Sequence, residues 1–288
     1  MQYREPLFRP PAEADSLIFQ VAFGCPHNTC RFCLMYKGVK YSARVLDELL
    51  KEIESAGRIY PDARRIFLAD GDVMALPFPS LLAIFAKLNE CFPELSRINS
   101  YANGSSILKL SKKELTELHR LKLNTLYIGL ESGDQKLLDE VCKNEKVDDM
   151  IDGVKTVQDI GIKASVMILL GLAGKNASEE HAIKTAEALN KMQPRLLSAL
   201  RFVEFPGKTK MHEGYLASTE YEIVCELRKI IQNLDLKKTV FRANHSSNPL
   251  PLGGRFPQDK ETLLAQLQNM LESNFLDKKG PGSTPLWL

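Results

Sequence analysis

The stretch SLIFQVAFGCPHNTCRFC, residues 16–33, decides the fold class and holds the first candidate site. Residues 16–24 are mostly apolar and predict a strand that is covered on both faces. The loop that follows places Cys25, Cys30 and Cys33 within nine residues. Because the active sites of α/β folds are built at the carboxyl ends of strands, we expect the three cysteines at such an end.

Outward from this stretch, strand patterns alternate with helix patterns. Residues 42–57 place apolar side chains on one helical face, with Ser42 as the expected N-cap and Gly57 as the expected end. Further strands are predicted at residues 64–70, 97–103, 124–131, 161–172 and 195–205. Further helices are predicted at residues 78–92, from 111, from about 134 to 160, at 178–192 and from 219, with capping boxes at Ser111–Glu114 and Thr219–Glu222.

This alternation predicts the fold class. Strands that alternate with helices form right-handed βαβ units and a parallel sheet. Six units predict an α/β fold that is a partial (β/α)6 barrel similar to a TIM barrel, because eight would be needed to close the barrel. A doubly wound open sheet is the alternative architecture.

The chain divides into three predicted parts: an N-terminal arm at residues 1–15, a core at 16–235 and a C-terminal capping extension at 236–288. In the extension, residues 239–258 are rich in Asn, Ser, Pro and Gly and predict an ordered loop. Residues 259–273 predict an amphipathic helix, and residues 278–288 a frayed or docking tail. No low-complexity linker separates a second domain.

Composition limits the possible partners and compartment. The chain has 38 basic and 36 acidic residues, a net charge of +2, which gives no global electrostatic reason to expect nucleic acid. No apolar run approaches the roughly 20 residues of a membrane span, and the N-terminus lacks a secretory signal pattern. We therefore expect the reducing cytoplasm, where six cysteines do not predict a disulfide framework.

The clustered cysteines predict a metal site. Thiolates favour zinc, copper(I) or iron–sulfur clusters. Structural zinc sites and electron-transfer clusters usually take four protein ligands, whereas this loop offers three cysteines. His27 could complete a zinc site; otherwise one metal position stays open, as catalysis requires. Cys91, Cys142 and Cys225 lie in helical patterns and are interpreted as small buried hydrophobes.

The cysteine loop resembles the cluster-binding motif of the radical S-adenosylmethionine (radical SAM) superfamily. The usual motif has three residues between its first two cysteines, whereas this chain has four. The resemblance implies that Cys25, Cys30 and Cys33 ligate three irons of a 4Fe–4S cluster whose fourth iron binds SAM. It also implies that Phe32 packs beside the adenine; packing within the loop is the alternative.

Two further segments resemble the same family. LADGDVMALP, residues 68–77, stands where the family has a Gly-Gly-Glu turn, which implies that Asp70, Gly71 and Asp72 hold the methionine amino group. VMILLGLAG, residues 166–174, resembles the strand whose backbone flanks the adenine, and implicates Leu169, Leu170 and Gly171.

The ribose of SAM has its own predicted contacts. YIGLESGD, residues 127–134, places Glu131 where the coproporphyrinogen oxidase-like and methylthiotransferase-like branches have a ribose-binding acid. Ser100 and Asn103 are weaker candidates for the same contact. Lys143 and Lys146 are candidates for the methionine carboxylate, with a solvated helix surface as the alternative.

The resemblance covers residues 16–235 and implies an enzyme. In this family, one electron from the reduced cluster cleaves SAM to a 5′-deoxyadenosyl radical, which abstracts hydrogen from a substrate. We expect a small-molecule substrate and an electron donor such as flavodoxin or ferredoxin, and neither a membrane nor a nucleic-acid partner. Substrate contacts are expected from Arg201, Glu204 or residues 244–248, each of which has a surface role as its alternative. The competing hypotheses are a non-catalytic iron–sulfur or zinc protein and a radical SAM enzyme that modifies RNA.

Overall fold

The computed structural model describes residues 3–205, 207–209 and 211–282, which form two compact units. The first unit contains the residues up to 28 together with 33–128 and 152–164. The second contains residues 29–32, 129–151 and those from 165 onward. Strand β6 and helix α6 each pass from one unit into the other.

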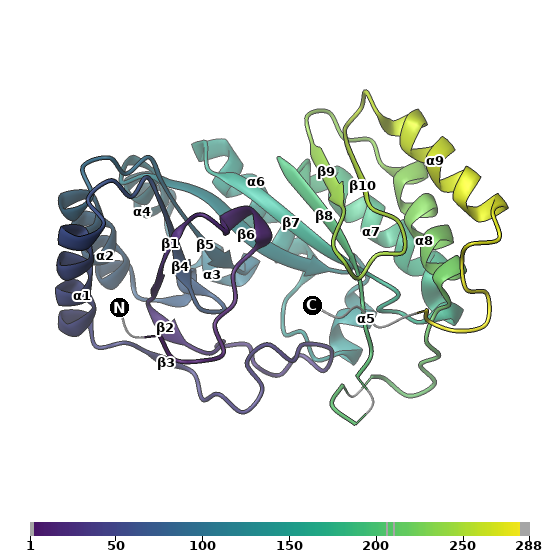
Figure 1. The fold of residues 1–288 in the computed structure, drawn as a ribbon, viewed down its shortest axis with the longest axis horizontal. Helices are drawn as coiled ribbons and strands as arrows, with labels where there is room; N and C mark the ends of the chain where they lie inside the picture. The colour runs from purple at the N-terminus through teal and green to yellow at the C-terminus, as the bar shows by residue number, and fades with distance from the viewer. Residues whose placement is uncertain (1–2, 206, 210, 283–288) are drawn as a thin grey trace. The chain divides into compact units, whose positions relative to one another are not determined.

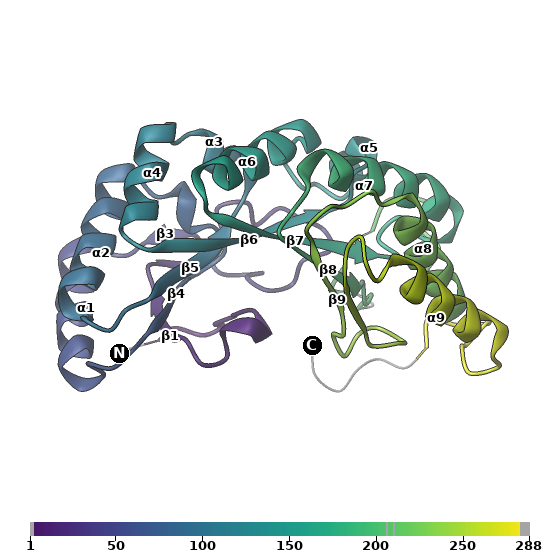
Figure 2. The ribbon, with the colours of Figure 1, turned by 90° about the horizontal axis from the view of Figure 1, so that it is seen from above.

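Parallel strands and the helices between them make up most of the first unit. Its elements are η1 (Pro11–Glu13), β1 (Leu17–Gln20), β2 (Ala22–Phe23), β3 (Ser42–Ala43), α1 (Leu46–Ile59), β4 (Arg65–Ala69), η2 (Val73–Ala75), α2 (Phe78–Cys91), β5 (Arg97–Ala102), α3 (Gly104–Leu108), α4 (Lys112–Arg120) and the first part of β6 (Leu123–Glu131). The strand order is β1-β4-β5-β6, and all these pairs are parallel. Helices α1 and α2 lie side by side along one face of β1, β4 and β5 (Figures 1 and 2).

Strand register divides the side chains of this unit between two faces. Leu68, Ser100 and Leu126 share one register position and therefore one face, where all three are fully buried. The opposite face has an aromatic cluster in which the Phe67 and Tyr101 ring centroids are 5.1 Å apart. Leu7 of the N-terminal arm packs against this aromatic cluster.

The second unit repeats the same alternation. Its elements are α5 (Gln135–Glu140), the first turn of α6 (Val147–Ile160), β7 (Lys163–Leu170), η3 (Lys175–Ala177), α7 (Ser178–Met192), β8 (Leu196–Arg201), α8 (Glu220–Asn233), β9 (Val240–Ala243), β10 (Leu252–Arg255) and α9 (Lys260–Glu272). Strands β7, β8 and β9 are parallel, and β10 is antiparallel to β9. Helices α7, α8 and α9 follow one another beside these strands (Figure 1).

The α/β prediction is confirmed, and so are both capping boxes. Ser111 and Thr219 each accept a hydrogen bond from a backbone N–H three residues on, and the Glu114 and Glu222 carboxylates accept one in return. Both helices therefore begin where the sequence predicts. No helix in the described ranges is long and apolar enough to cross a membrane.

Two local predictions were wrong. The helix expected at residues 42–57 begins at Leu46, because Ser42 and Ala43 pair with Phe23 and Ala22 in the small ribbon β2–β3. Residues 239–258, expected to form a loop, contain β9 and β10. The apolar alternation of β9 lasts only four residues, and its pairing with β8 is a tertiary contact that local sequence does not specify.

The C-terminal extension packs against its own unit. The predicted helix at 259–273 is confirmed as α9. Part of the predicted tail docks at the start of α8, where the backbone N–H of Glu220 donates to the carbonyl of Gly280 (3.2 Å). The rest of that tail, residues 283–288, lies outside the described residues.

Candidate cofactor-binding site

The cysteine loop is divided between the two units. Cys25 and Cys33 belong to the first unit and are half-buried, whereas Cys30 belongs to the second and is buried. None of the three forms a disulfide bond. In the described ranges, no three Cys, His, Asp or Glu side chains are gathered into a ready metal site. The three-cysteine ligand set therefore stays a prediction from the sequence.

Gly71 lies directly against Cys25. A Cβ atom at position 71 would be 2.6 Å from Cys25 Cβ and 2.9 Å from its Sγ, which is closer than real contacts allow. The Gly71 N–H also donates to the carbonyl of Gly24 (3.1 Å). The turn after β4 thus supports the first cysteine of the loop, and only glycine leaves room for its side chain.

Asp70 binds the start of the same loop. Its Oδ2 accepts hydrogen bonds from the Gly24 N–H (3.0 Å) and from the Gln20 amide (3.1 Å). Burial raises the pKa of Asp70 to about 6, although these hydrogen bonds oppose the shift. The sequence suggested a contact with SAM for Asp70, and the structure adds this connection between β1, β4 and the cysteine loop.

Asp72 is the centre of a buried polar network. Its Oδ2 lies 2.9 Å from Nε2 of His27, and its Oδ1 accepts a hydrogen bond from the Ser106 hydroxyl (2.9 Å). The Asn103 amide donates to Oδ2 as well (3.3 Å). The network joins the cysteine loop, the turn after β4 and the start of α3. His27, considered above as a zinc ligand, directs this nitrogen at Asp72.

Ser100 lies apart from these groups. Its side chain is fully buried on the face of β5 that it shares with Leu68 and Leu126, and its hydroxyl has no hydrogen-bond partner among the described residues. Asn103, in contrast, joins the Asp72 network after β5 ends. The structure therefore brings Asn103, Asp70, Gly71 and Asp72 together around the start of the cysteine loop.

In the second unit, Glu131 and Lys143 form a buried pair. Glu131 ends β6 with a positive φ of 62°, and its Oε1 lies 3.8 Å from Nζ of Lys143. The second carboxylate oxygen, Oε2, is buried and has no hydrogen-bond partner in the described part of the chain. Burial raises the pKa of Glu131, and the ammonium group opposes the shift.

Gly129 makes this position of Glu131 possible. A Cβ atom at residue 129 would lie 2.0 Å from Oε1 of Glu131, so the carboxylate folds back over a residue that has no side chain. The segment that holds Cys30 is hydrogen-bonded to the residues that directly follow α5. The Arg31 N–H donates to the Val141 carbonyl (2.8 Å), and the Thr29 hydroxyl donates to the Cys142 carbonyl (3.1 Å).

Two residues predicted near the adenine share one apolar cluster. Phe32 and Leu169 both pack against the buried side chains of Leu137, Val141, Leu172 and Ala173. Gly171, with a φ of 78°, has both backbone groups engaged: its N–H donates to Glu226 (2.8 Å) and its carbonyl accepts from the Tyr215 hydroxyl (3.2 Å). The structure thus brings Phe32 and Leu169 together.

Sequence reasoning missed two buried carboxylates. Glu226 of α8 accepts hydrogen bonds from Gly171, from the Ser178 hydroxyl and from His181. Glu13 of the N-terminal arm accepts from the Asn99 amide (2.7 Å) and from the Tyr127 hydroxyl (2.5 Å). The sequence does contain a signal for Glu226, which lies three residues after Ile223 and four before Ile230 and therefore shares their buried helical face.

Comparison with known proteins decides the family. Residues 19–186 match the model of the radical SAM superfamily. The chain belongs to this superfamily. Members of this superfamily bind a 4Fe–4S cluster and SAM, which are therefore the cofactors of this chain.

Two curated proteins match most of the chain. The chain is 26% identical over 254 residues to an uncharacterized protein of Methanocaldococcus jannaschii, covering 82% of this chain and 50% of that protein. It is 22% identical over 218 residues to the heme chaperone HemW of Bacillus subtilis, covering 73% and 57%. This radical SAM chain thus spans about half the length of these curated relatives.

A solved structure shows the same fold. Coproporphyrinogen III oxidase (HemN) from Escherichia coli aligns with a TM-score of 0.60 at 16% identity, covering 75% of this chain and 52% of that one. The observed residues also fit the cofactors of the superfamily. Gly71 leaves room for the Cys25 thiol, and Oε2 of Glu131 is a buried acceptor without a partner among the described residues.

Proposed function

We propose that this chain cleaves SAM reductively and directs the resulting 5′-deoxyadenosyl radical at a small-molecule substrate. When bound, the reduced cluster supplies the electron that breaks the carbon–sulfur bond, and the substrate loses a hydrogen atom to the radical. The observation that carries the proposal is Glu131, whose buried Oε2 has no hydrogen-bond partner in the described ranges. Leaving a buried acceptor unsatisfied costs about 1–3 kcal/mol, so a ligand with hydroxyl groups would relieve a cost that the fold now bears.

Different residues of the chain would bind the cluster and the separate parts of SAM. Cys25, Cys30 and Cys33 would hold three irons, and Glu131 would accept the ribose hydroxyls. The Asp72 network would fix His27, and with it the start of the cysteine loop. Phe32 and Leu169 offer an apolar surface for a flat ring and exclude water from it.

The proposed partners follow from charge and from the need for an electron. The near-balance of 38 basic and 36 acidic residues favours a small molecule over nucleic acid as substrate. The proposed electron donor is a small redox protein such as flavodoxin or ferredoxin, since the reduced cluster must be regenerated after each one-electron cleavage.

A cysteine series tests the proposal. We expect the anaerobically reconstituted protein to hold about four irons and four sulfides, and to release deoxyadenosine when dithionite and SAM are added. Replacing Cys25, Cys30 or Cys33 by Ala should abolish both results. Cys91→Ala and Cys225→Ala are the matched controls and should change neither.

The opposite results are equally clear. One zinc per chain and no sulfide would replace the proposal with a zinc site. A fully loaded and reduced protein that bound SAM but released no deoxyadenosine would contradict the catalytic proposal and leave a binding protein.

The similarity to HemW gives a second candidate function. That relative is named a heme chaperone, and it matches 73% of this chain. If this chain handles heme, titration with hemin should give a saturable change in the Soret absorbance at one heme per chain. Absence of saturation at equimolar hemin would remove this candidate and leave the first proposal intact.

A further inference from the structure

An exposed turn follows the last cysteine of the loop in the first unit. Residues 25–46 contain four basic residues and no Asp or Glu, although basic and acidic residues are almost equal in number over the whole chain. Two of the four, Lys37 and Lys40, belong to residues 36–40, and both are exposed. We name residues 36–40 the basic turn. An unbalanced positive charge therefore lies on the segment that carries the cysteines.

We propose that the basic turn docks the electron donor, a small one-electron redox protein with an acidic surface. The inference rests on the proposed radical chemistry and adds to it the surface that the donor recognises. In each encounter one electron passes from the donor to the cluster, and no covalent bond forms or breaks. Because electron transfer between proteins slows steeply with distance, the donor must dock close to the cysteine loop.

The first argument is that the basic turn is fixed against the cysteine loop. Asn28, which lies between the first two cysteines, donates its side-chain amide to the carbonyls of Tyr36 (2.6 Å) and Val39 (3.2 Å). The Lys37 ammonium donates in return to the Asn28 carbonyl (3.2 Å). An exposed positive charge is thereby held directly beside the cysteine segment.

The second argument is that the basic turn is both ordered and open to a partner. The Tyr36 side chain is buried and packs edge-on against Phe8, with ring centroids 5.4 Å apart. The Val39 N–H donates to the Tyr36 carbonyl (3.0 Å), which closes the turn. At its tip, Gly38 has a φ of 81°, and a Cβ atom there would meet nothing within 4 Å. The tip therefore faces open space, and docking requires little further ordering of the backbone.

The third argument is that the charges of the two lysines are available. No described carboxylate forms an ion pair with Lys37 or Lys40. Arg44 differs, because its Nη2 lies 2.9 Å from Oε2 of Glu52 and its charge is thereby neutralised. The basic turn thus presents two positive charges that no described carboxylate balances. Such charges attract an acidic surface and steer its approach.

The small number of charges selects the class of partner. Electron-transfer complexes are weak and bury little area, so steering by a few charges suits them. A protein that binds nucleic acid strongly neutralises roughly 6–10 phosphates, whereas this chain has a net charge of only +2. An acidic protein is therefore favoured over RNA as the partner of the basic turn.

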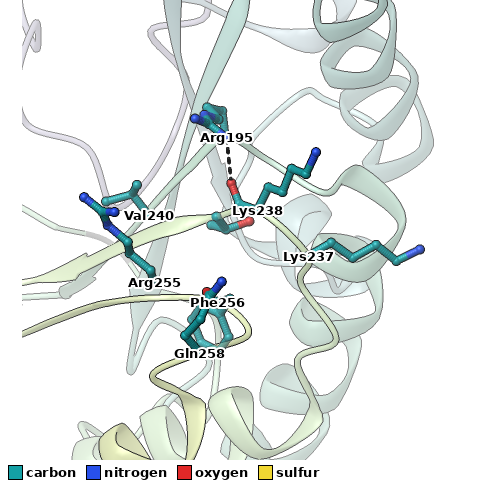
Figure 3. A pocket seen from close by; sticks show the side chains of 8 residues that line it. Arg195, Lys237, Lys238, Val240, Arg255, Phe256 and Gln258 are labelled. Carbon is teal, nitrogen blue, oxygen red and sulfur yellow. Dashed lines mark hydrogen bonds between the residues drawn. The ribbon is translucent and has the colours of Figure 1, made fainter.

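A second pair of exposed lysines provides the matched control. Lys237 and Lys238 precede β9 in the second unit and, with Arg255, line part of a cavity of about 260 Å³. Figure 3 shows that the charged ends of these three side chains point away from one another. The change Lys237→Glu/Lys238→Glu alters the net charge as much as Lys37→Glu/Lys40→Glu does, but outside the cysteine loop.

Binding and reduction by a purified acidic flavodoxin test the proposal. We expect the oxidised flavodoxin to bind the reconstituted protein in calorimetric titration at an ionic strength of about 0.01 M, where charges act over about 30 Å. Lys37→Glu/Lys40→Glu should weaken this binding at least about tenfold, and the control should stay within about threefold of the unchanged protein.

The rate of electron transfer gives a second readout. The second-order rate of cluster reduction by reduced flavodoxin, followed by absorbance, should fall in the basic-turn variant by a factor similar to that of the binding. At an ionic strength of about 1 M, where the Debye length is about 3 Å, the difference between the variant and the unchanged protein should disappear.

A small uncharged donor separates docking from damage to the cluster. Photoreduced 5-deazariboflavin needs no docking surface, so it should reduce the variant and the unchanged protein at equal rates. Iron content and dithionite-driven deoxyadenosine release are measured in parallel and should not change in the variant. Because these last two measurements test the proposed radical chemistry, its failure is distinguishable from failure of the docking surface.

Four results would overturn the proposal. They are no binding of flavodoxin to the unchanged protein at low ionic strength, no loss in the basic-turn variant, an equal loss in the control, and slower reduction by 5-deazariboflavin as well. The last would assign the two lysines to the cluster itself. Transfer RNA that binds more tightly than flavodoxin, and only when the lysines are present, would replace the protein partner with nucleic acid. If circular dichroism shows that the glutamate variant is misfolded, Lys37→Gln/Lys40→Gln takes its place.

Discussion

At the scale of single residues, glycines decide where the reactive side chains of the candidate site can lie. Gly71 leaves room for Cys25, and Gly129 leaves room for the Glu131 carboxylate. Neither glycine has a positive φ. Their role is therefore close approach of another group, and it is readable only from the tertiary structure.

The change Gly129→Ala tests this role of Gly129. The added Cβ would lie 2.0 Å from Oε1 of Glu131, so the carboxylate must rotate away from its present position. We expect SAM affinity to fall at least tenfold, measured by equilibrium binding to the reconstituted protein. Gly253→Ala is the control, because the nearest atom to its Cβ would be the flexible end of Arg242 at 3.2 Å and the nearest backbone atom would be at an ordinary contact distance of 3.7 Å. Equal affinities in both variants would show that the position of Glu131 does not matter for SAM.

At the scale of elements, the sequence correctly predicted the helices whose starts are marked by local signals such as capping boxes. The helix predicted at residues 178–192 is observed over the same residues, and two capping boxes mark the starts of α4 and α8. Ser42 shows the limit, because an N-cap and a strand residue can look alike and the choice depended on pairing with Phe23. β9 shows it again, since its four residues gain their structure only by pairing with β8 and β10, which are contacts between segments far apart in the sequence or joined by a loop.

In the candidate site, too, motifs indicate single residues, whereas the contacts between them are known only from the structure. The motif resemblance pointed to Asp72, Glu131 and the cysteines as candidates, but the pairing of Asp72 with His27 is a contact across 45 residues that the motifs do not contain. Glu226 shows the same limit. Its spacing from Ile223 and Ile230 indicates a buried helical face, but its partner, the N–H of Gly171, lies 55 residues away and is known only from the structure.

The change Glu226→Gln tests how far α8 depends on this carboxylate. An amide keeps the size but has one acceptor oxygen instead of two, so it cannot keep both the hydrogen bond from Gly171 to Oε1 and the one from Ser178 to Oε2. We expect a loss of about 1–3 kcal/mol in the free energy of unfolding, measured with urea. Glu187→Gln, at an exposed position of α7, should cost less than about 0.5 kcal/mol. A similar small cost for both would mean that the network adds nothing to stability.

At the scale of the whole molecule, the few carboxylates whose pKa is clearly shifted respond to pH in two opposite ways. Surface residues such as Glu114 have a lowered pKa, here because the Ser111 backbone and side chain donate to the carboxylate. The stability that such residues contribute to the folded state is lost as pH falls through their lowered pKa. Asp70 and Glu131 have a raised pKa because they are buried, and burial disfavours the charged form.

Asp70 gives the clearest prediction about stability and pH. Its pKa is about 6 in the folded chain and 3.8 in the unfolded one, so between these values the folded state binds more protons. Stability from this residue is therefore fully present below about pH 4 and is lost as pH rises through about 6. The shift of about two units corresponds to at most about 3 kcal/mol.

The change Asp70→Asn isolates this effect, because an amide oxygen can still accept from the Gly24 N–H but does not titrate. Measured by urea unfolding between pH 4 and 8 under reducing conditions, the variant should gain stability relative to the unchanged protein as pH rises through 6. Asp62→Asn, at an exposed position, should show no such gain. If the difference between Asp70→Asn and the unchanged protein stays constant over this range, Asp70 is already charged in the folded chain without cost. The hydrogen bonds from Gly24 and Gln20 would then outweigh its burial.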